Sequence, residues 1–70
     1  MSKRRLSPAR LAERLRRTRL AKGWSQEKAA EDLGVHRVTL ARWETRAFPL
    51  EGMARRLVEL WIESIERELR

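Results

Sequence analysis

Residues 25–44 read SQEKAAEDLGVHRVTLARWE, and this stretch decides the fold of the chain. Ser25 is a good helix cap, and apolar residues follow it at helical spacing as far as Leu33. Gly34 suits a tight turn that needs a positive φ angle, and a second helix is predicted over residues 37–44. The stretch therefore predicts two short helices packed at a steep angle around a turn, which is the layout of a helix-turn-helix.

The second of these helices has an inner and an outer face. Leu40 and Trp43 are large and apolar and lie three residues apart, so they form the inner face. Arg37, Val38 and Arg42 must then point elsewhere. This helix therefore presents side chains that are free to meet a ligand.

The rest of the chain predicts further helices and no strand. Ser7 and Pro8 mark a helix start, because serine caps free amide groups and proline fits the first helical position. This helix is predicted to run to about Lys22. Pro49 interrupts the pattern, and a last helix, or two with a slight bend, is predicted from about residue 50 to 70. The expected fold is all-α, a compact four- to five-helix domain with a long C-terminal helix.

The size and composition of the chain exclude several classes of protein. Seventy residues allow one domain, which we expect over residues 7–70, after a flexible basic arm over residues 1–6. The chain has no cysteine and only His36, so we expect no disulfide, no metal site and no cofactor. No apolar run approaches the about 20 residues of a membrane span, and no signal peptide is evident. We therefore expect a cytoplasmic protein with no membrane partner.

Positive charge is concentrated at the start of the chain. The net charge is +7 and the sequence pI is about 11.5, which indicates a polyanionic partner such as nucleic acid or an acidic membrane surface. Residues 1–22 carry nine Lys or Arg against Glu13 alone, whereas charges nearly cancel in the remainder. The basic segment thus lies beside the helix-turn-helix rather than within it.

Residues 19–44 resemble the DNA-binding core of the lambda-repressor-like family, also called the Cro and xenobiotic-response-element class. The matching motifs are Gly23-Trp24-Ser25-Gln26, Ala30, Leu33-Gly34-Val35, Thr39-Leu40 and Arg42-Trp43-Glu44. Together, at this mutual spacing, they are far more specific than any one of them alone. The resemblance implies a domain that binds double-stranded DNA with its second motif helix in the major groove.

The resemblance also implies which residues contact DNA. Arg37, Val38 and Arg42 would meet base edges, whereas Gln26 and Thr39 would meet phosphates. The chemistry agrees, because an arginine fork can donate two hydrogen bonds to guanine and a valine can pack against a thymine methyl group. The alternative for the two arginines is an ordinary solvated surface, and the valine could instead pack on a neighbouring loop.

Further contacts to the DNA backbone are expected from basic residues outside the motif. The candidates are Lys3, Arg4, Arg5, Arg10, Arg16, Arg17 and Arg46. A positive side chain near a phosphate releases condensed counterions, which adds affinity without reading sequence. One hypothesis is that the arm wraps into a groove of the DNA; the alternative for most of these side chains is again a solvated surface.

Arg19 and Glu44 match a pair that the resemblance implies is structural. In this family the pair often forms a partly buried salt bridge between the first helix and the end of the reading helix. Removing one partner would leave a buried charge without compensation, so Glu44→Ala is expected to damage folding before DNA contact. Trp24 and Trp43 occupy apolar positions of the motif, so core packing is favoured over base stacking.

Two apolar stripes run along the last predicted helix. We expect the first stripe to cover the helix-turn-helix, and it consists of Leu50, Met53, Leu57 and Leu60. The second stripe then has no partner within a small domain, and it consists of Val58, Trp61, Ile62, Ile65 and Leu69. This surplus predicts a homodimer that pairs its last helices and reads a palindromic operator with half-sites ~34 Å apart. The alternative is a helix folded back over its own subunit.

The function predicted from these features is sequence-specific transcriptional regulation, most simply as a homodimeric repressor that occludes a promoter. One alternative is an antitoxin-type regulator, which would bind a toxin partner as well as its own promoter. Another is a protein-interaction or RNA-binding module on the same fold. We do not expect an enzyme, because no nucleophile-base pair, carboxylate dyad or phosphate-cradling glycine loop is evident.

Overall fold

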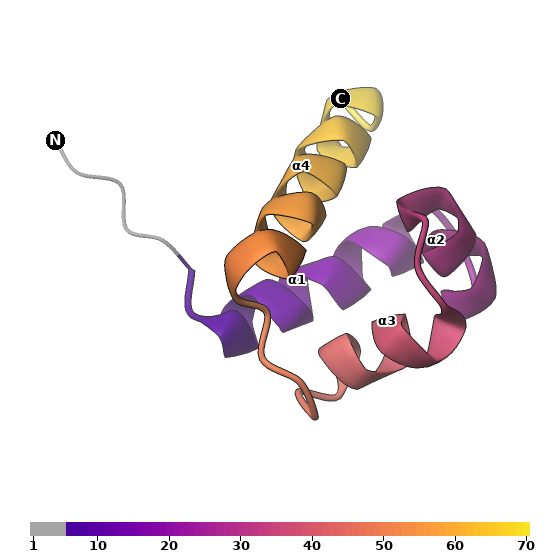
Figure 1. The fold of residues 1–70 in the computed structure, drawn as a ribbon. Helices are drawn as coiled ribbons and strands as arrows, with labels where there is room; N and C mark the ends of the chain where they lie inside the picture. The colour runs from indigo at the N-terminus through magenta and orange to yellow at the C-terminus, as the bar shows by residue number, and fades with distance from the viewer. Residues whose placement is uncertain (1–5) are drawn as a thin grey trace, which may run out of the picture.

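A computed structural model describes residues 6–70 of the chain, and this part consists of helices joined by short loops, without a strand (Figure 1). The helices are α1 (Pro8–Ala21), α2 (Gln26–Leu33), α3 (Arg37–Glu44) and α4 (Gly52–Glu68). The predicted all-helical class with a long last helix is confirmed. Within the described residues no helix is both long and apolar enough to cross a membrane.

The first two helices begin at the predicted caps. The Ser7 hydroxyl accepts a hydrogen bond from the Arg10 amide at 3.2 Å, and the Ser25 hydroxyl accepts one from the Lys28 amide at 3.1 Å. Each bond satisfies an amide that has no partner within its helix. His36 precedes α3 and makes no such side-chain bond, so α3 depends more on its neighbours for stability.

The turn between α2 and α3 is closed by a left-handed residue, as predicted. Gly34 has a φ angle of 80°, which side chains with a Cβ atom adopt at a cost. The Val35 amide then donates to the Ala30 carbonyl at 2.9 Å, and the Gly34 amide donates to the Glu31 carbonyl at 3.2 Å. These two bonds form a Schellman motif, which ends α2 and sets the angle at which α3 departs.

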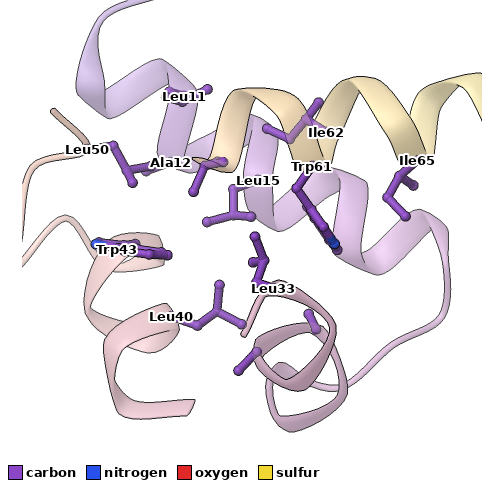
Figure 2. Close-up of a cluster of buried hydrophobic side chains, with 13 residues drawn as sticks. Leu11, Ala12, Leu15, Leu33, Leu40, Trp43, Leu50, Trp61, Ile62 and Ile65 are labelled. Atoms are coloured by element: carbon purple, nitrogen blue, oxygen red, sulfur yellow. The ribbon is translucent and has the colours of Figure 1, made fainter. Parts of the chain in front are cut away.

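The hydrophobic core is shared by all four helices. Leu15 of α1 is fully buried and lies in the middle of the cluster in Figure 2, with Leu40 of α3 on one side and Ile62 of α4 on the other. Helix α3 packs against α1 and α2, whereas α4 packs along α1 and reaches α2. Because α3 buries only its inner face, its outer face remains available for contact.

Two tryptophans join α4 to α2 and to the end of α1. Trp61 is buried, and its indole Nε1 donates to the Asp32 carboxylate of α2 at 2.8 Å. Its ring meets the ring of Trp24 at a centroid distance of 6.4 Å and a tilt of 44°. A buried indole therefore has both an apolar contact and a hydrogen-bond partner, which fixes its position.

The expected roles of the two apolar stripes on α4 are reversed in the structure. Val58, Trp61, Ile62 and Ile65 were expected on a pairing surface, but all four are buried in the core of their own subunit. Of that stripe, only Leu69 is exposed. In the stripe that was expected to be buried, only Leu50 is buried. The other three residues of that stripe are exposed, and they are Met53, Leu57 and Leu60.

The reversal has a physical reason. The sequence alone suggested that only the start of α4 covers the domain, whereas α4 packs along α1 through its second half. Glu66 pairs with Arg14 at 2.6 Å, and Glu68 pairs with Lys22 at 3.2 Å. These pairs lie on either side of the face that carries the second stripe, so this face is turned towards α1.

We predict that two truncations of equal size on α4 have very different effects on stability. Ile62→Ala removes a side chain that is 2% exposed and should lower the free energy of unfolding by about 2–5 kcal/mol. Leu60→Ala removes as many atoms from a side chain that is 47% exposed and should change it by less than about 1 kcal/mol. Urea unfolding followed by circular dichroism at low protein concentration measures both. Equal losses would contradict the observed orientation of α4.

Candidate nucleic-acid interface

A buried ion pair holds α3 against α1. Arg19 donates from Nε to Oε2 of Glu44 at 2.8 Å and from Nη2 to Oε1 at 3.0 Å. Their side chains are 10% and 2% exposed. A bidentate pair of this kind fixes both distance and orientation, so the end of α3 is set relative to α1.

Two further hydrogen bonds complete the network around this pair. Arg19 Nη1 donates to the Trp24 carbonyl at 2.8 Å, and Gln26 Nε2 donates to Glu44 Oε1 at 3.2 Å. Residues 6–70 contain no buried side-chain nitrogen or oxygen without a partner. The network therefore joins α1, the loop before α2, the first turn of α2 and the end of α3.

The position of Gln26 differs in part from the sequence interpretation. It was expected to meet a phosphate, and its link to Glu44 was not foreseen. An amide nitrogen carries two hydrogens, and the bond to Glu44 uses one of them. The second N–H is the donor that the expected phosphate contact would use.

The outer face of α3 presents the residues expected to read bases. Arg37, Val38 and Arg42 are exposed, while Thr39 is half-buried beside them. Within residues 6–70, the side chains of Arg37 and Arg42 form neither an ion pair nor a hydrogen bond. Their N–H donors thus have no hydrogen-bond partner among these residues and can be offered to an acceptor, as bidentate contact to guanine requires.

The loop after α3 carries another exposed arginine in an unusual conformation. Arg46 has a φ angle of 67°, which is uncommon for a residue other than glycine. Its Nη2 lies 3.5 Å from Oε2 of Glu13, and the other oxygen of this carboxylate lies 3.8 Å from Arg17 Nη2. Arg17 of α1 and Arg46 of the loop thus gather around one carboxylate.

The remaining basic residues of α1 are not equivalent. Arg10 and Arg16 are exposed, and Arg10 lines a shallow hollow with Glu13 and Arg17. Arg14 is committed to Glu66 through three hydrogen bonds of 2.6–3.0 Å. Arg10, Arg16 and Arg17 therefore remain candidates for phosphate contact, while Arg14 serves the packing of α4.

The basic arm expected over residues 1–6 lies almost wholly outside the described residues, and so do Lys3, Arg4 and Arg5. The described chain starts at Leu6, whose carbonyl accepts a hydrogen bond from the buried Arg55 of α4. Arg55 is held in turn by Glu59 at 3.0 Å. The base of the arm is therefore tied to the start of α4.

The part of the chain from residue 6 onward contains no group of His, Cys, Asp or Glu residues arranged to hold a metal ion. What the surface offers instead is a set of exposed guanidinium groups. Exposed arginines lie on α3 and on the loop that follows it, and their positive charge suits an anionic partner.

A family described as helix-turn-helix matches residues 15–58, which extend from the middle of α1 into α4 and cover well over half of the chain. No curated protein and no solved structure matches the chain.

We predict that two Arg–Glu pairs of similar geometry contribute very differently to stability. Glu44→Gln leaves the buried Arg19 without a counter-charge and should lower the free energy of unfolding by about 3 kcal/mol or more. Glu66→Gln breaks the ion pair with Arg14, in which the Arg14 side chain is 43% exposed and the Glu66 side chain 37% exposed. This change should lower the free energy of unfolding by less than about 1 kcal/mol. Thermal unfolding of both variants at low and high salt tests this. A small effect of Glu44→Gln would contradict the structural role of the buried pair.

Proposed function

Because the chain belongs to the lambda-repressor-like family of DNA-binding helix-turn-helix regulators, we propose that it represses transcription as a sequence-specific homodimer. The observation that carries this proposal is the outer face of α3. There Arg37 and Arg42, whose guanidinium groups make no hydrogen bond or ion pair within residues 6–70, lie on the same helix as the exposed Val38. Such a face offers both hydrogen-bond donors and an apolar contact to base edges in the major groove.

Base readout in this proposal depends on three side chains. Arg37 and Arg42 each donate a pair of hydrogen bonds to O6 and N7 of a guanine, and Val38 packs against a thymine methyl group. The network around Glu44 keeps α3 fixed relative to α1, so the helix enters the groove in one orientation. Preferred half-sites then combine G·C pairs with a neighbouring thymine.

Phosphate contacts in this proposal come from both sides of the reading helix. Gln26 and Thr39 contact phosphates on one part of the DNA backbone. Phosphates on another part are contacted by Arg10, Arg17 and Arg46. Arg16 and the arm over residues 1–6 add further positive charge. These contacts supply affinity that falls with salt but carries no sequence information.

Dimerisation in this proposal uses the exposed stripe of α4. Met53, Leu57 and Leu60 form an apolar face that the subunit leaves uncovered. Arg56 and Glu63 lie two helical turns apart along one edge of this face. A two-fold axis that pairs α4 helices antiparallel brings Arg56 opposite the partner's Glu63 and repeats the contact on the other side. The apolar stripe and the two opposite charges along its edge thus favour a second copy of the chain as the partner that covers this surface.

A dimer of this kind would read an inverted repeat and cover a promoter. Two modules double the number of base pairs contacted, and their spacing sets half-sites about one helical turn, ~34 Å, apart. The protein would act on DNA in the cytoplasm. Residues 7–70 would serve as one DNA-binding domain. The fraction of operator DNA that it occupies would be set by the concentration of the protein.

We predict that base readout and phosphate contact respond differently to mutation. Arg42→Ala should relax the preference at one base pair of each half-site, with a loss of about 5- to 150-fold on the preferred sequence. Arg17→Ala should weaken binding about equally on all sequences and reduce the salt slope by about 1. Selection of bound sites from a random duplex library, followed by titration at several salt concentrations, measures both effects.

The matched control for these variants is Arg70→Ala, which removes an exposed arginine beyond the end of α4. It should leave site preference unchanged. A library that yields no enriched motif for the unmutated protein would overturn the proposal of sequence-specific reading. An enriched motif without two-fold symmetry would overturn only the dimeric part of it.

We predict that Leu57→Glu abolishes the dimer while α-helical content is kept. A charge on the apolar stripe must be desolvated when two α4 helices pair, which disfavours association. Leu20→Glu is the control, since it places the same charge on a similarly exposed leucine of α1. Light scattering with and without operator DNA gives the mass. If the unmutated protein is a monomer at high micromolar concentration in both conditions, the proposed dimer is overturned.

A further inference from the structure

Phe48 lies beside one of the two candidate base-reading arginines. The guanidinium carbon of Arg42 is 5.0 Å from the centroid of the Phe48 ring, within the range of a cation–π contact. Phe48 is 47% exposed, so this residue is not simply part of the core. Within residues 6–70, Arg37 has no comparable contact with an aromatic ring.

Backbone hydrogen bonds hold Phe48 close to Arg42. The Arg42 carbonyl accepts hydrogen bonds from the Ala47 amide at 2.9 Å and from the Phe48 amide at 3.3 Å. The Arg46 amide donates to the Trp43 carbonyl at 3.2 Å, and together these bonds form the Schellman end of α3. The left-handed conformation of Arg46 turns the chain back, so Arg42 and Phe48 lie at the two ends of one hydrogen-bonded turn.

The ring also has an apolar environment that does not depend on Arg42. Phe48 lines a hollow of about 210 Å³ together with Trp43 and Pro49 and with Ala9 and Ala12 of α1. The surface of this hollow is almost wholly apolar, so one side of Phe48 borders apolar groups of α1 and of the loop. Phe48 thus has apolar neighbours besides the Arg42 guanidinium.

We propose that Phe48 is a positioning residue that holds the Arg42 guanidinium in the orientation in which it reads a base. This proposal rests on the base-reading role of Arg42 given above. An unrestrained arginine loses rotamer freedom when it binds, and a side chain already restrained loses less. The contact places the guanidinium over the ring, and no hydrogen bond within residues 6–70 occupies its N–H donors, so they remain available to guanine.

The consequence is an asymmetry between the two arginines of α3. Arg42 is restrained before binding and should discriminate strongly at its base pair. Arg37 is unrestrained and should tolerate more variation at its own. Changes at Phe48 should therefore alter preference at one base pair of each half-site and leave the other as it was.

The test uses the full chain and the operator obtained by selection. Phe48→Leu keeps an apolar side chain beside the hollow but removes the aromatic face, whereas Phe48→Trp keeps an aromatic face. Phe48→Leu should lower affinity about two- to five-fold, as expected for loss of an exposed cation–π contact. The preference should fall at the base pair relaxed by Arg42→Ala, and the pair relaxed by Arg37→Ala is the internal control. Phe48→Trp should keep affinity and preference within about two-fold of the unmutated protein.

Combining substitutions separates positioning from direct DNA contact. In an Arg42→Ala background, Phe48→Leu should have no further effect on affinity, because the group that it positions is gone. An equal loss in both backgrounds would overturn the proposal and indicate that the ring itself touches DNA or supports the fold. Thermal unfolding identifies the second case, since a purely structural role would lower stability without changing base preference.

Failure of the proposed function gives a different result. If Arg42→Ala keeps the selected motif unchanged, readout by Arg42 is wrong, and positioning by Phe48 falls with it. If Arg42→Ala relaxes the motif but Phe48→Leu changes both base pairs alike, only the role of Phe48 is overturned.

Discussion

The buried contact between Arg19 and Glu44 is the constraint on which the reading surface depends. Helix α3 has eight residues and no side-chain cap, so by itself it would be marginal in water. Two charges removed from solvent are stabilising only when every donor and acceptor is satisfied. The Trp24 carbonyl and the Gln26 amide meet this condition, and in doing so they connect α1 and α2 to the end of α3.

The rest of the domain is arranged around this fixed centre. Helix α4 packs along α1 through Val58, Ile62 and Ile65, and its exposed ion pairs to α1 add orientation more than stability. The apolar stripe that remains on α4 faces away from the core. The outer face of α3 and the exposed stripe of α4 thus belong to elements that each pack on α1, so a rigid α1 keeps them in a constant relation.

Features decided by local chemistry could be predicted from the sequence. Ser25 and Gly34 fix the ends of α2 because capping and left-handed backbone depend on a few adjacent atoms. The packing face of α4 could not be predicted, because both stripes have the same helical period and only the approach of α1 distinguishes them. Phe48 was also missed. It lies in a loop without periodicity, and its contact with Arg42 depends on a left-handed turn at a residue type that rarely adopts one.

That turn shows how stability and reading are linked at the end of α3. The same Schellman arrangement ends α1 and α2, where glycines take the left-handed position, whereas α3 has Arg46 there at a cost on the order of 1 kcal/mol. Glycine would form the turn more easily, but it would lose the guanidinium that meets Glu13. An arginine at this position keeps the turn that places Phe48 beside Arg42 and adds a positive charge next to the reading helix. The strain is therefore located where one residue both shapes the loop and supplies charge for contact with DNA.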